Sequence, residues 1–411
     1  MGLAEVLARV LGDGAEIRAY DGSRTGPPDA PVCIEVRTPR ALSYLAQAGG
    51  DLGMARAFVA GDLEVTRGDL YAAMTAIAGD DIDLSWPERW RLLRDLGGPR
   101  LLRPVPLPEQ EVRRLPGRRH SKRRDQAAIA HHYDVSNRFY RWVLGSSMAY
   151  TCAVYPSADA TLEDAQYAKH DLVARKLGLR PGMRLLDVGC GWGGMVVHAA
   201  QHYGVRVLGV TLSRQQAEWG QKAIAEAGLS DLATIRHLDY RDVTGSGFDA
   251  ISSIGLTEHI GKANLRAYFR FLYDKLTPGG RLLNHCITRP TNLEPAVRRR
   301  FFINKYVFPD GELFGPGYLV SLMHDTGFEV QHEENLREHY ARTTAAWSAN
   351  LDRHWDESVE EVGLGRARVW RLYLAGSQFG FTRNHIQLHQ ILGLKLGPSA
   401  ESGMPLRPDW T

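Results

Sequence analysis

Compact apolar runs alternate with amphipathic segments from about residue 180 onward. Each run is typical of a buried strand, and each amphipathic segment has the spacing of a helix that covers one face of a sheet. The alternation predicts a mostly parallel, doubly wound α/β sheet of the Rossmann-like kind. The expected strands are 184–190, 205–213, 233–240, 248–255 and 281–287, and the expected helices are 193–204, 215–229 and 264–280.

The first part of the chain has a different pattern. Residues 32–39 alternate as a strand does, and a helix is expected to begin near Pro39. Residues 1–97 contain no grouping of residues typical of catalysis. We expect a smaller α+β domain there, and the pattern leaves open whether it contacts lipid or only caps the structure.

A segment rich in proline and arginine, residues 98–124, follows this domain. Proline stiffens an extended chain and like charges resist packing, so the segment is expected to be a linker. Its basic residues suit either a solvated tether or adhesion to anionic lipid, and no nucleic-acid-reading motif accompanies them. The predicted organisation is an N-terminal domain (1–97), a linker (98–124), a larger domain (125–395) and a tail (396–411).

Composition narrows the setting of the protein. The chain has 411 residues, a formal net charge of +3 and four widely separated cysteines, Cys33, Cys152, Cys190 and Cys286. Without a CxxC pair, neither a disulfide framework nor a metal site is expected. No signal peptide and no apolar stretch of membrane-spanning length are apparent. We therefore expect a cytoplasmic protein that reaches the inner face of the cell membrane only as a peripheral protein.

The most informative local motif is the glycine-rich turn Asp187-Val-Gly-Cys-Gly-Trp-Gly-Gly194 after an apolar strand. Glycines there allow a tight turn and let backbone amides approach a ligand. The turn reads GxGxG, whereas dinucleotide sites have GxGxxG, and the next strand ends in Thr211-Leu-Ser213 without the acidic residue that a dinucleotide ribose requires.

This turn, followed by GVTLSRQQ, resembles the cofactor segments of the cyclopropane-fatty-acid synthase family of S-adenosylmethionine-dependent methyltransferases. The stretch 128–156 resembles the same family's HYDxSNxFY and MxYTCAxY signatures. The resemblance implies S-adenosylmethionine as the methyl donor. It also implies these cofactor contacts: Tyr133, Tyr150, Thr151, Asp187, Gly189, Gly191, Gly193, Thr211, Leu212, Ser213, Gln216, Asp239 and Tyr240.

Three further segments, SIGLTEHIG, LLNHCI and EHYARTTAAW, match the family in order and spacing. In the family, the matching residues hold a bicarbonate ion that accepts a proton. The resemblance therefore implies a catalytic group made of Cys152, Glu258, His285, Ile287 and Tyr340. Aromatic side chains of 301–308, with Phe314, Tyr318 and Tyr340, are candidates to line a carbocation site or to be ordinary core. Arg298–Arg300 are candidates for a headgroup site or a solvated helix face.

The substrate implied by the resemblance is the cis double bond of a phospholipid acyl chain, with oleoyl expected, at an anionic membrane surface. The branch that makes 10-methylene chains is the closer match, with cyclopropane formation as the alternative. Leu256-Thr257 replaces the apolar-Phe pair often found before the Glu-His motif. A separate reductase is expected to saturate a methylene product, and homo-oligomerisation stays open. A small-molecule O- or N-methyltransferase and a catalytically silent lipid-binding protein are the competing readings.

Overall fold

A computed structural model describes residues 2–12, 14–48, 50–77, 91, 94–112, 115–126, 136–297 and 301–410. The chain forms two compact units, and each draws on more than one stretch of sequence. Unit 1 comprises 1–113, 298–309 and 355–379, and unit 2 comprises 114–297, 310–354 and 380–411. The predicted boundaries at 97, 124 and 395 stay predictions.

Unit 1 contains a four-stranded sheet in the order β2-β1-β3-β4. Strands β1 and β3 are parallel, and the other two neighbouring pairs are antiparallel. The strand expected over 32–39 is β3, and the helix that begins at Pro39 is α2, as predicted. The strands are β1 Glu16–Ala19, β2 Arg24–Thr25, β3 Cys33–Val36 and β4 Leu63–Arg67. The helices are α1 Leu3–Leu11, α2 Pro39–Ala48, α3 Gly50–Val59, α4 Leu70–Ile77, η1 Gly98–Leu102, α12 Phe302–Tyr306, α15 Trp355–Val362 and most of α16 Leu364–Thr382.

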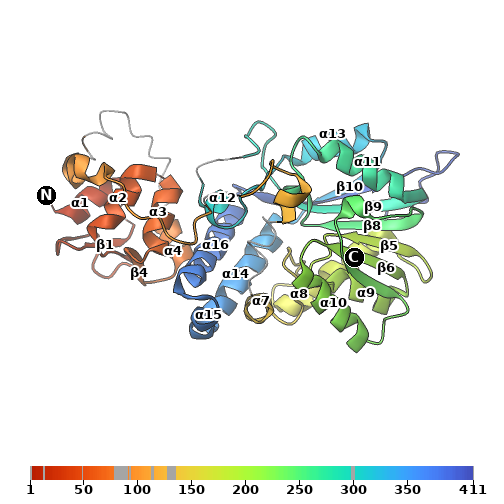
Figure 1. The fold of residues 1–411 in the computed structure, drawn as a ribbon, viewed down its shortest axis with the longest axis horizontal. Coiled ribbons are helices and arrows are strands. Elements are labelled where there is room, and N and C mark those ends of the chain that lie inside the picture. Colours follow the sequence, from red (N-terminus) through yellow and green to blue (C-terminus); the bar gives the residue numbers. More distant parts are fainter. Residues whose placement is uncertain are drawn as a thin grey trace. The chain divides into compact units, whose positions relative to one another are not determined.

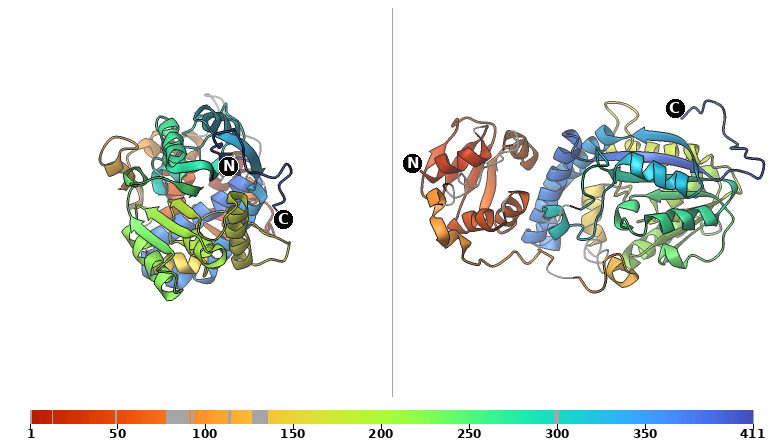
Figure 2. Two further views of the ribbon diagram at one scale, coloured as in Figure 1. Left: turned by 90° about the vertical axis from the view of Figure 1, so that its right-hand side faces the viewer. Right: turned by 90° about the horizontal axis from the view of Figure 1, so that it is seen from above.

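Unit 2 is built on a seven-stranded sheet in the order β10-β11-β9-β8-β5-β6-β7 (Figure 1). The strands from β9 to β7 run parallel, while β11 is antiparallel to both β9 and β10. In Figure 2 the blue strands β10 and β11 lie beside the green strands of this sheet. The predicted doubly wound sheet is confirmed. The strands are β5 Arg184–Val188, β6 Arg206–Thr211, β7 Ala233–His237, β8 Phe248–Ile254, β9 Leu276–Thr288, β10 Glu329–Asn335 and β11 Gln387–Leu394.

Helices cover both faces of this sheet (Figure 1). On one face, α8, α9 and α10 bury apolar side chains such as Val173, Val196 and Ile224. On the other face, α11 and α13 bury side chains such as Phe269 and Leu319. The helices of unit 2 are α7 Asn137–Leu144, α8 Leu162–Leu177, α9 Gly194–Tyr203, α10 Arg214–Glu226, η2 Tyr240–Asp242, η3 Thr257–His259, α11 Leu265–Lys275, α13 Pro316–Asp325 and α14 Arg337–Arg353.

The basic part of the predicted linker is held by acidic partners of unit 2. Arg124 makes a two-pronged ion pair with Asp310, Arg119 pairs with Asp310 and Glu312, and Lys122 pairs with Asp242. These pairs neutralise part of the charge run, so the described residues 115–126 are not a freely solvated tether. Arg118 and Arg123 remain exposed.

Candidate active site

A glycine turn follows the carboxyl end of β5 in unit 2. Gly189, Gly191 and Gly193 have φ of +74°, +54° and +88°, a backbone region that favours glycine. A Cβ on Gly193 would lie 2.5 Å from the Ile235 side chain, whereas a Cβ on Gly191 would meet nothing within 4 Å. Gly191 lines a pocket, so its open side is the space in which a ligand can approach the backbone.

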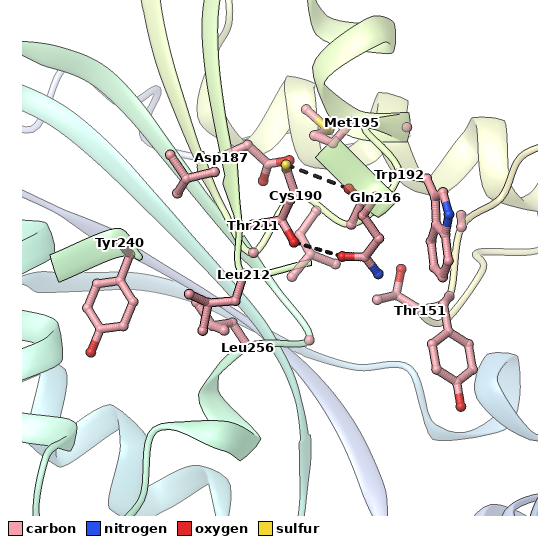
Figure 3. A pocket seen from close by; sticks show the side chains of 18 of the residues that line it. Thr151, Asp187, Cys190, Trp192, Met195, Thr211, Leu212, Gln216, Tyr240 and Leu256 are labelled. Carbon is pink, nitrogen blue, oxygen red and sulfur yellow. Dashed lines mark hydrogen bonds between the residues drawn. The ribbon is translucent and has the colours of Figure 1, made fainter. Parts of the chain in front are cut away.

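The pocket lies along the carboxyl ends of β5, β6 and β8, which is where ligands of open α/β sheets bind. Figure 3 shows Tyr240 toward one end, Trp192 and Thr151 toward the other, and Asp187 and Thr211 between them. Nine of the predicted cofactor contacts line it: Tyr150, Thr151, Asp187, Gly189, Gly191, Thr211, Leu212, Gln216 and Tyr240.

The end of β6 shapes the middle of the pocket. The Thr211 hydroxyl donates to Gln216 Oε1 over 2.7 Å, and this bond is drawn in Figure 3. Ser213 lies behind it as the N-cap of α10 and accepts a hydrogen bond from the Gln216 amide. Ser213 is therefore a structural neighbour of the pocket wall, in which Leu212 takes the lining position.

An arginine organises the Tyr240 end of the pocket. Arg241 donates to both carboxylate oxygens of Asp239 and also pairs with Asp125, and both Arg241 and Asp125 line the pocket. Asp239 caps η2, and its pKa is lowered by its hydrogen bonds to Arg241 although burial opposes this. Asp239 thus positions Arg241 from behind the lining.

Two buried ionisable groups from different elements meet at the base of the pocket. Asp187, the penultimate residue of β5, accepts a hydrogen bond from Ser252 over 2.6 Å, while burial raises its pKa to about 6. Lys169 on α8 is 1% exposed, and burial lowers its pKa to about 7. The Lys169 ammonium donates to the Thr151 hydroxyl over 3.1 Å and contacts His170 Nε2 at 2.8 Å.

A second group of ionisable side chains is assembled by β8, β9 and the η3 turn. Glu258 on η3 accepts a hydrogen bond from the Ile287 amide through Oε1, at 2.7 Å. Its other oxygen is buried without a partner among the described residues, and burial raises the pKa of Glu258 to about 7. The register of β8 with β9 sets His285 opposite Ile254, four residues before Glu258.

The hydrogen bonds of His285 determine its tautomer. Lys176 donates to Gln390 Oε1, which turns the amide nitrogen of Gln390 toward His285 Nδ1 at 3.2 Å. Nδ1 must then accept, so the neutral ring carries its proton on Nε2. Nε2 is buried and has no partner among the described residues. The site therefore contains a buried imidazole donor and a buried carboxyl oxygen, and neither is hydrogen-bonded within the described part of the chain.

Cys152 and Tyr340 are buried and already engaged by the protein. The Cys152 thiol donates to the carbonyl oxygens of Ala153 and Leu336, and burial raises its pKa well above the usual range. Tyr340 on α14 stacks on Phe381, with ring centroids 4.3 Å apart. A thiol held in this state is no nucleophile.

Several proposed residues lie elsewhere. The aromatic run 301–308 belongs to unit 1, where Phe302 stacks on Tyr306 and Phe308 contacts Tyr373 edge-on. Phe314 and Tyr318 pack in the core on the α11–α13 face of the unit 2 sheet. Phe302, Tyr306 and Phe314 are buried as ordinary core residues are, whereas Phe301 is exposed. Tyr133 and Arg298–Arg300 lie outside the described residues.

Sequence analysis missed Lys169, His170, Trp192 and Arg241, all of which line the pocket. For Lys169 a signal was present. The positions of Ala165, Leu172 and Val173 define the buried face of α8, and Lys169 falls on it. A lysine at a core position is rarely buried without a specific role.

Comparisons with known proteins agree with this geometry. The family model described as mycolic acid cyclopropane synthetase matches residues 120–391. The chain belongs to this family. It is 51% identical to a protein of Mycobacterium tuberculosis named as a probable fatty acid methyltransferase, over all of this chain and 98% of that one. It is 32% identical to the cyclopropane-fatty-acyl-phospholipid synthase of Escherichia coli, over 88% of each chain.

A solved structure shares the fold. The mycolic acid cyclopropane synthase CmaA1, complexed with SAH and CTAB, matches 65% of this chain and 97% of its own with a TM-score of 0.62 and 32% identity. The chain is therefore an S-adenosylmethionine-dependent methyltransferase of the cyclopropane and fatty acid methyltransferase family, and it acts on lipids. Among the described residues, no helix is long and apolar enough to cross a membrane.

Proposed function

We propose that the enzyme methylates the cis double bond of an oleoyl-type chain in a phospholipid and forms a 10-methylene branch. The observation that carries the proposal is that Glu258 Oε2 and His285 Nε2 are both buried and that neither has a hydrogen-bond partner among the described residues. An alkene needs no base before it attacks the methyl donor. A base is needed only afterwards, when the carbocation must lose a proton.

Bicarbonate fits these two atoms by its chemistry. The Nε2–H of His285 is a donor that lacks an acceptor, and a carboxyl group with a pKa near 7 can share a proton with a neighbouring oxyanion. Glu258 and His285 would hold the ion, and the Ile287 amide fixes the Glu258 carboxylate. Bound there, bicarbonate would supply the proton acceptor.

The choice between methylene and cyclopropane depends on whether a hydride moves before proton loss. A hydride shift places the positive charge on the carbon that carries the new methyl, which favours an exocyclic methylene. Leu256 lines the pocket, and the neighbouring Thr257 is buried and donates to Asn284 Oδ1 over 2.6 Å. These two residues precede Glu258, so they can offset its carboxyl group relative to the reacting carbon. Cyclopropane formation on the same substrate is the alternative.

Purified enzyme with S-adenosylmethionine and vesicles of oleoyl phosphatidylglycerol tests the proposal. Both products gain the same mass, so proton NMR of the extracted lipid is the deciding measurement. Vinylic methylene signals are expected. High-field cyclopropane signals alone would show that the product is a cyclopropane and not a methylene branch. Methylation of a small amine or phenol without any lipid product would show that the proposed substrate is wrong. A methylene product also calls for a separate reductase to saturate it, because this chain has no second nucleotide fingerprint.

We also propose that the enzyme works as a peripheral protein at an anionic membrane surface, the inner face of the cell membrane. Within the described residues 115–126, Arg118 and Arg123 are exposed, whereas Arg119 and Arg124 are paired with acidic residues. The double substitution Arg118→Gln and Arg123→Gln should weaken vesicle binding about 30-fold at low salt, since each basic residue at the surface gives about 1 kcal/mol. Co-sedimentation that is equal on neutral and anionic vesicles would show that the run has no role in adhesion.

A further inference from the structure

Alkene methylation releases one proton whichever product forms. The π electrons of the double bond make the new C–CH₃ bond while the S–CH₃ bond breaks, which leaves S-adenosylhomocysteine and a carbocation. A C–H bond then breaks, and its electron pair closes the ring or forms the methylene double bond. The proton is left in a buried pocket, and it must reach solvent before the next turnover.

Lys169 and His170 are adjacent residues on α8 that both line the pocket, and the proposed chemistry gives neither of them a role. The Lys169 Nζ to His170 Nε2 distance is 2.8 Å, which is a hydrogen bond. His170 is 6% exposed. A Cβ on Gly194, the first residue of α9, would come within 3.0 Å of the His170 ring, so this imidazole lies against the next helix.

Two more imidazoles continue from His170 along α9 toward the surface. The His170 and His198 ring centroids are 5.7 Å apart, and those of His198 and His202 are 4.7 Å apart. His198 is 6% exposed, and its Nε2 is buried and has no hydrogen-bond partner in the part of the chain that the structure describes, whereas His202 is exposed. The spacing between rings is one that a direct contact or a single water molecule spans.

We propose that Lys169, His170, His198 and His202 form a relay that carries the product proton from the methyl-transfer pocket to solvent. The relay rests on the proposed function, because only a reaction that releases a proton in the pocket needs it. Each neutral imidazole accepts a proton on one nitrogen and donates from the other, so the ring is suited to passing a proton on. Lys169 is the first group of the relay, and it must be neutral at that moment so that its amine can accept the proton.

Burial makes neutral forms of the relay groups accessible. It lowers the pKa of Lys169 to about 7 and that of His198 to about 4, so near pH 7 both groups can be neutral and can accept a proton. Around His198, α8 presents Tyr167 and Asp171, and α9 presents His202 and Tyr203. The Asp171 carboxylate is 3.8 Å from His198 Nε2 and is the negative group at the outer end, where Arg175 also pairs with it. At the inner end, Lys169 interacts with Asp187 and Cys152, and His285 acts on His170.

A single-turnover experiment with a pH-indicator dye in weak buffer tests the relay. Enzyme and S-adenosylmethionine are mixed with oleoyl phosphatidylglycerol vesicles, and S-adenosylhomocysteine formation is compared with the appearance of the proton in solution. In the wild type the two should coincide. In His198→Phe, release of the proton to solution should be about tenfold slower than formation of S-adenosylhomocysteine, because the aromatic ring remains but its nitrogens are gone. 4-Methylimidazole in the buffer should shorten the lag.

Tyr167→Phe is the matched control, because it leaves the same ring packing and keeps every imidazole. It should show no lag. His198→Gln is the second variant, in case phenylalanine disturbs folding, since it keeps a polar group that cannot relay a proton. If proton release and S-adenosylhomocysteine formation still coincide in both His198 variants, the relay is overturned. Failure of the wild type to form S-adenosylhomocysteine with the lipid instead overturns the proposed function.

Discussion

The cofactor pocket and the Glu258–His285 group lie side by side in unit 2, but they are built in different ways. The central part of the pocket wall comes from one continuous stretch, β5 to α10, and depends on backbone conformation at Gly189 and Gly191. The second group joins residues far apart in sequence and depends on burial and hydrogen-bond direction. A site formed by the backbone tolerates many different side chains around it but no added Cβ at its glycines. A site formed by side chains requires each specific chemical group.

The largest effect on turnover is expected when the Glu258–His285 group loses its carboxyl. Glu258→Gln should lower kcat by about 10² to 10⁴, because an oriented acid–base group is lost, with the affinity for S-adenosylmethionine almost unchanged. Turnover of the lipid and calorimetric titration of the cofactor measure the two quantities separately. A variant with wild-type turnover would remove Glu258 from the chemistry and would leave the two regions without a functional distinction.

A substitution in the glycine turn tests the cofactor pocket in the same way. Gly191→Val should weaken binding of S-adenosylmethionine by about 100-fold, or about 3 kcal/mol, since its side chain enters the space that the ligand needs. Gly182→Val is the control, because Gly182 has a φ of +86° and open space around its Cβ but does not line the pocket. Both variants carry the same backbone strain, and only Gly191→Val should lose affinity in calorimetry.

The pH dependence of the free energy of unfolding is a further property of the Glu258–His285 group. Burial raises the pKa of Glu258 from 4.5 to about 7, so between these values the folded state holds a proton that the unfolded chain has released. Stability due to this group is therefore full below pH 4.5, falls as pH rises to about 7, and stays low above it. Glu258→Gln removes the penalty and should raise the free energy of unfolding by at most about 3 kcal/mol at about pH 8.

Denaturant unfolding of the wild type and Glu258→Gln at about pH 5 and about pH 8 measures this difference. The gain should be small at the lower pH. Equal gains at both pH values would mean that the substitution acts through packing, and the carboxyl would then not be held in an unfavourable charged state.

The smallest effect concerns tautomer control. Gln390→Leu removes the donor that faces His285 Nδ1, so the ring proton is no longer confined to Nε2. We expect kcat to fall by up to about tenfold, with the same affinity for S-adenosylmethionine. Gln387→Leu on the same strand is the control, because Gln387 bonds to Asn384 instead. If the two variants behave alike, the orientation of His285 does not depend on Gln390.

Local sequence accounted for most of the cofactor region. The strands at 184–190 and 205–213 and the helices around them are present as predicted, because the apolar spacing and the glycine turn act over a few neighbouring residues. The same reasoning gave a less complete account of the basic run at 113–124. Its charge alone did not reveal that Asp310 and Glu312, almost two hundred residues later, pair with Arg119 and Arg124.

The sequence by itself therefore determined the sheet, the glycine turn and the family to which the chain belongs, since each follows from short-range patterns. Only the tertiary structure decided which ionisable groups are buried together. Lys169 becomes a group with a pKa near 7, and His285 a donor without an acceptor, because α8, β9 and β11 enclose them. Desolvation depends on everything that packs around a side chain, and residues distant in the chain supply most of that packing.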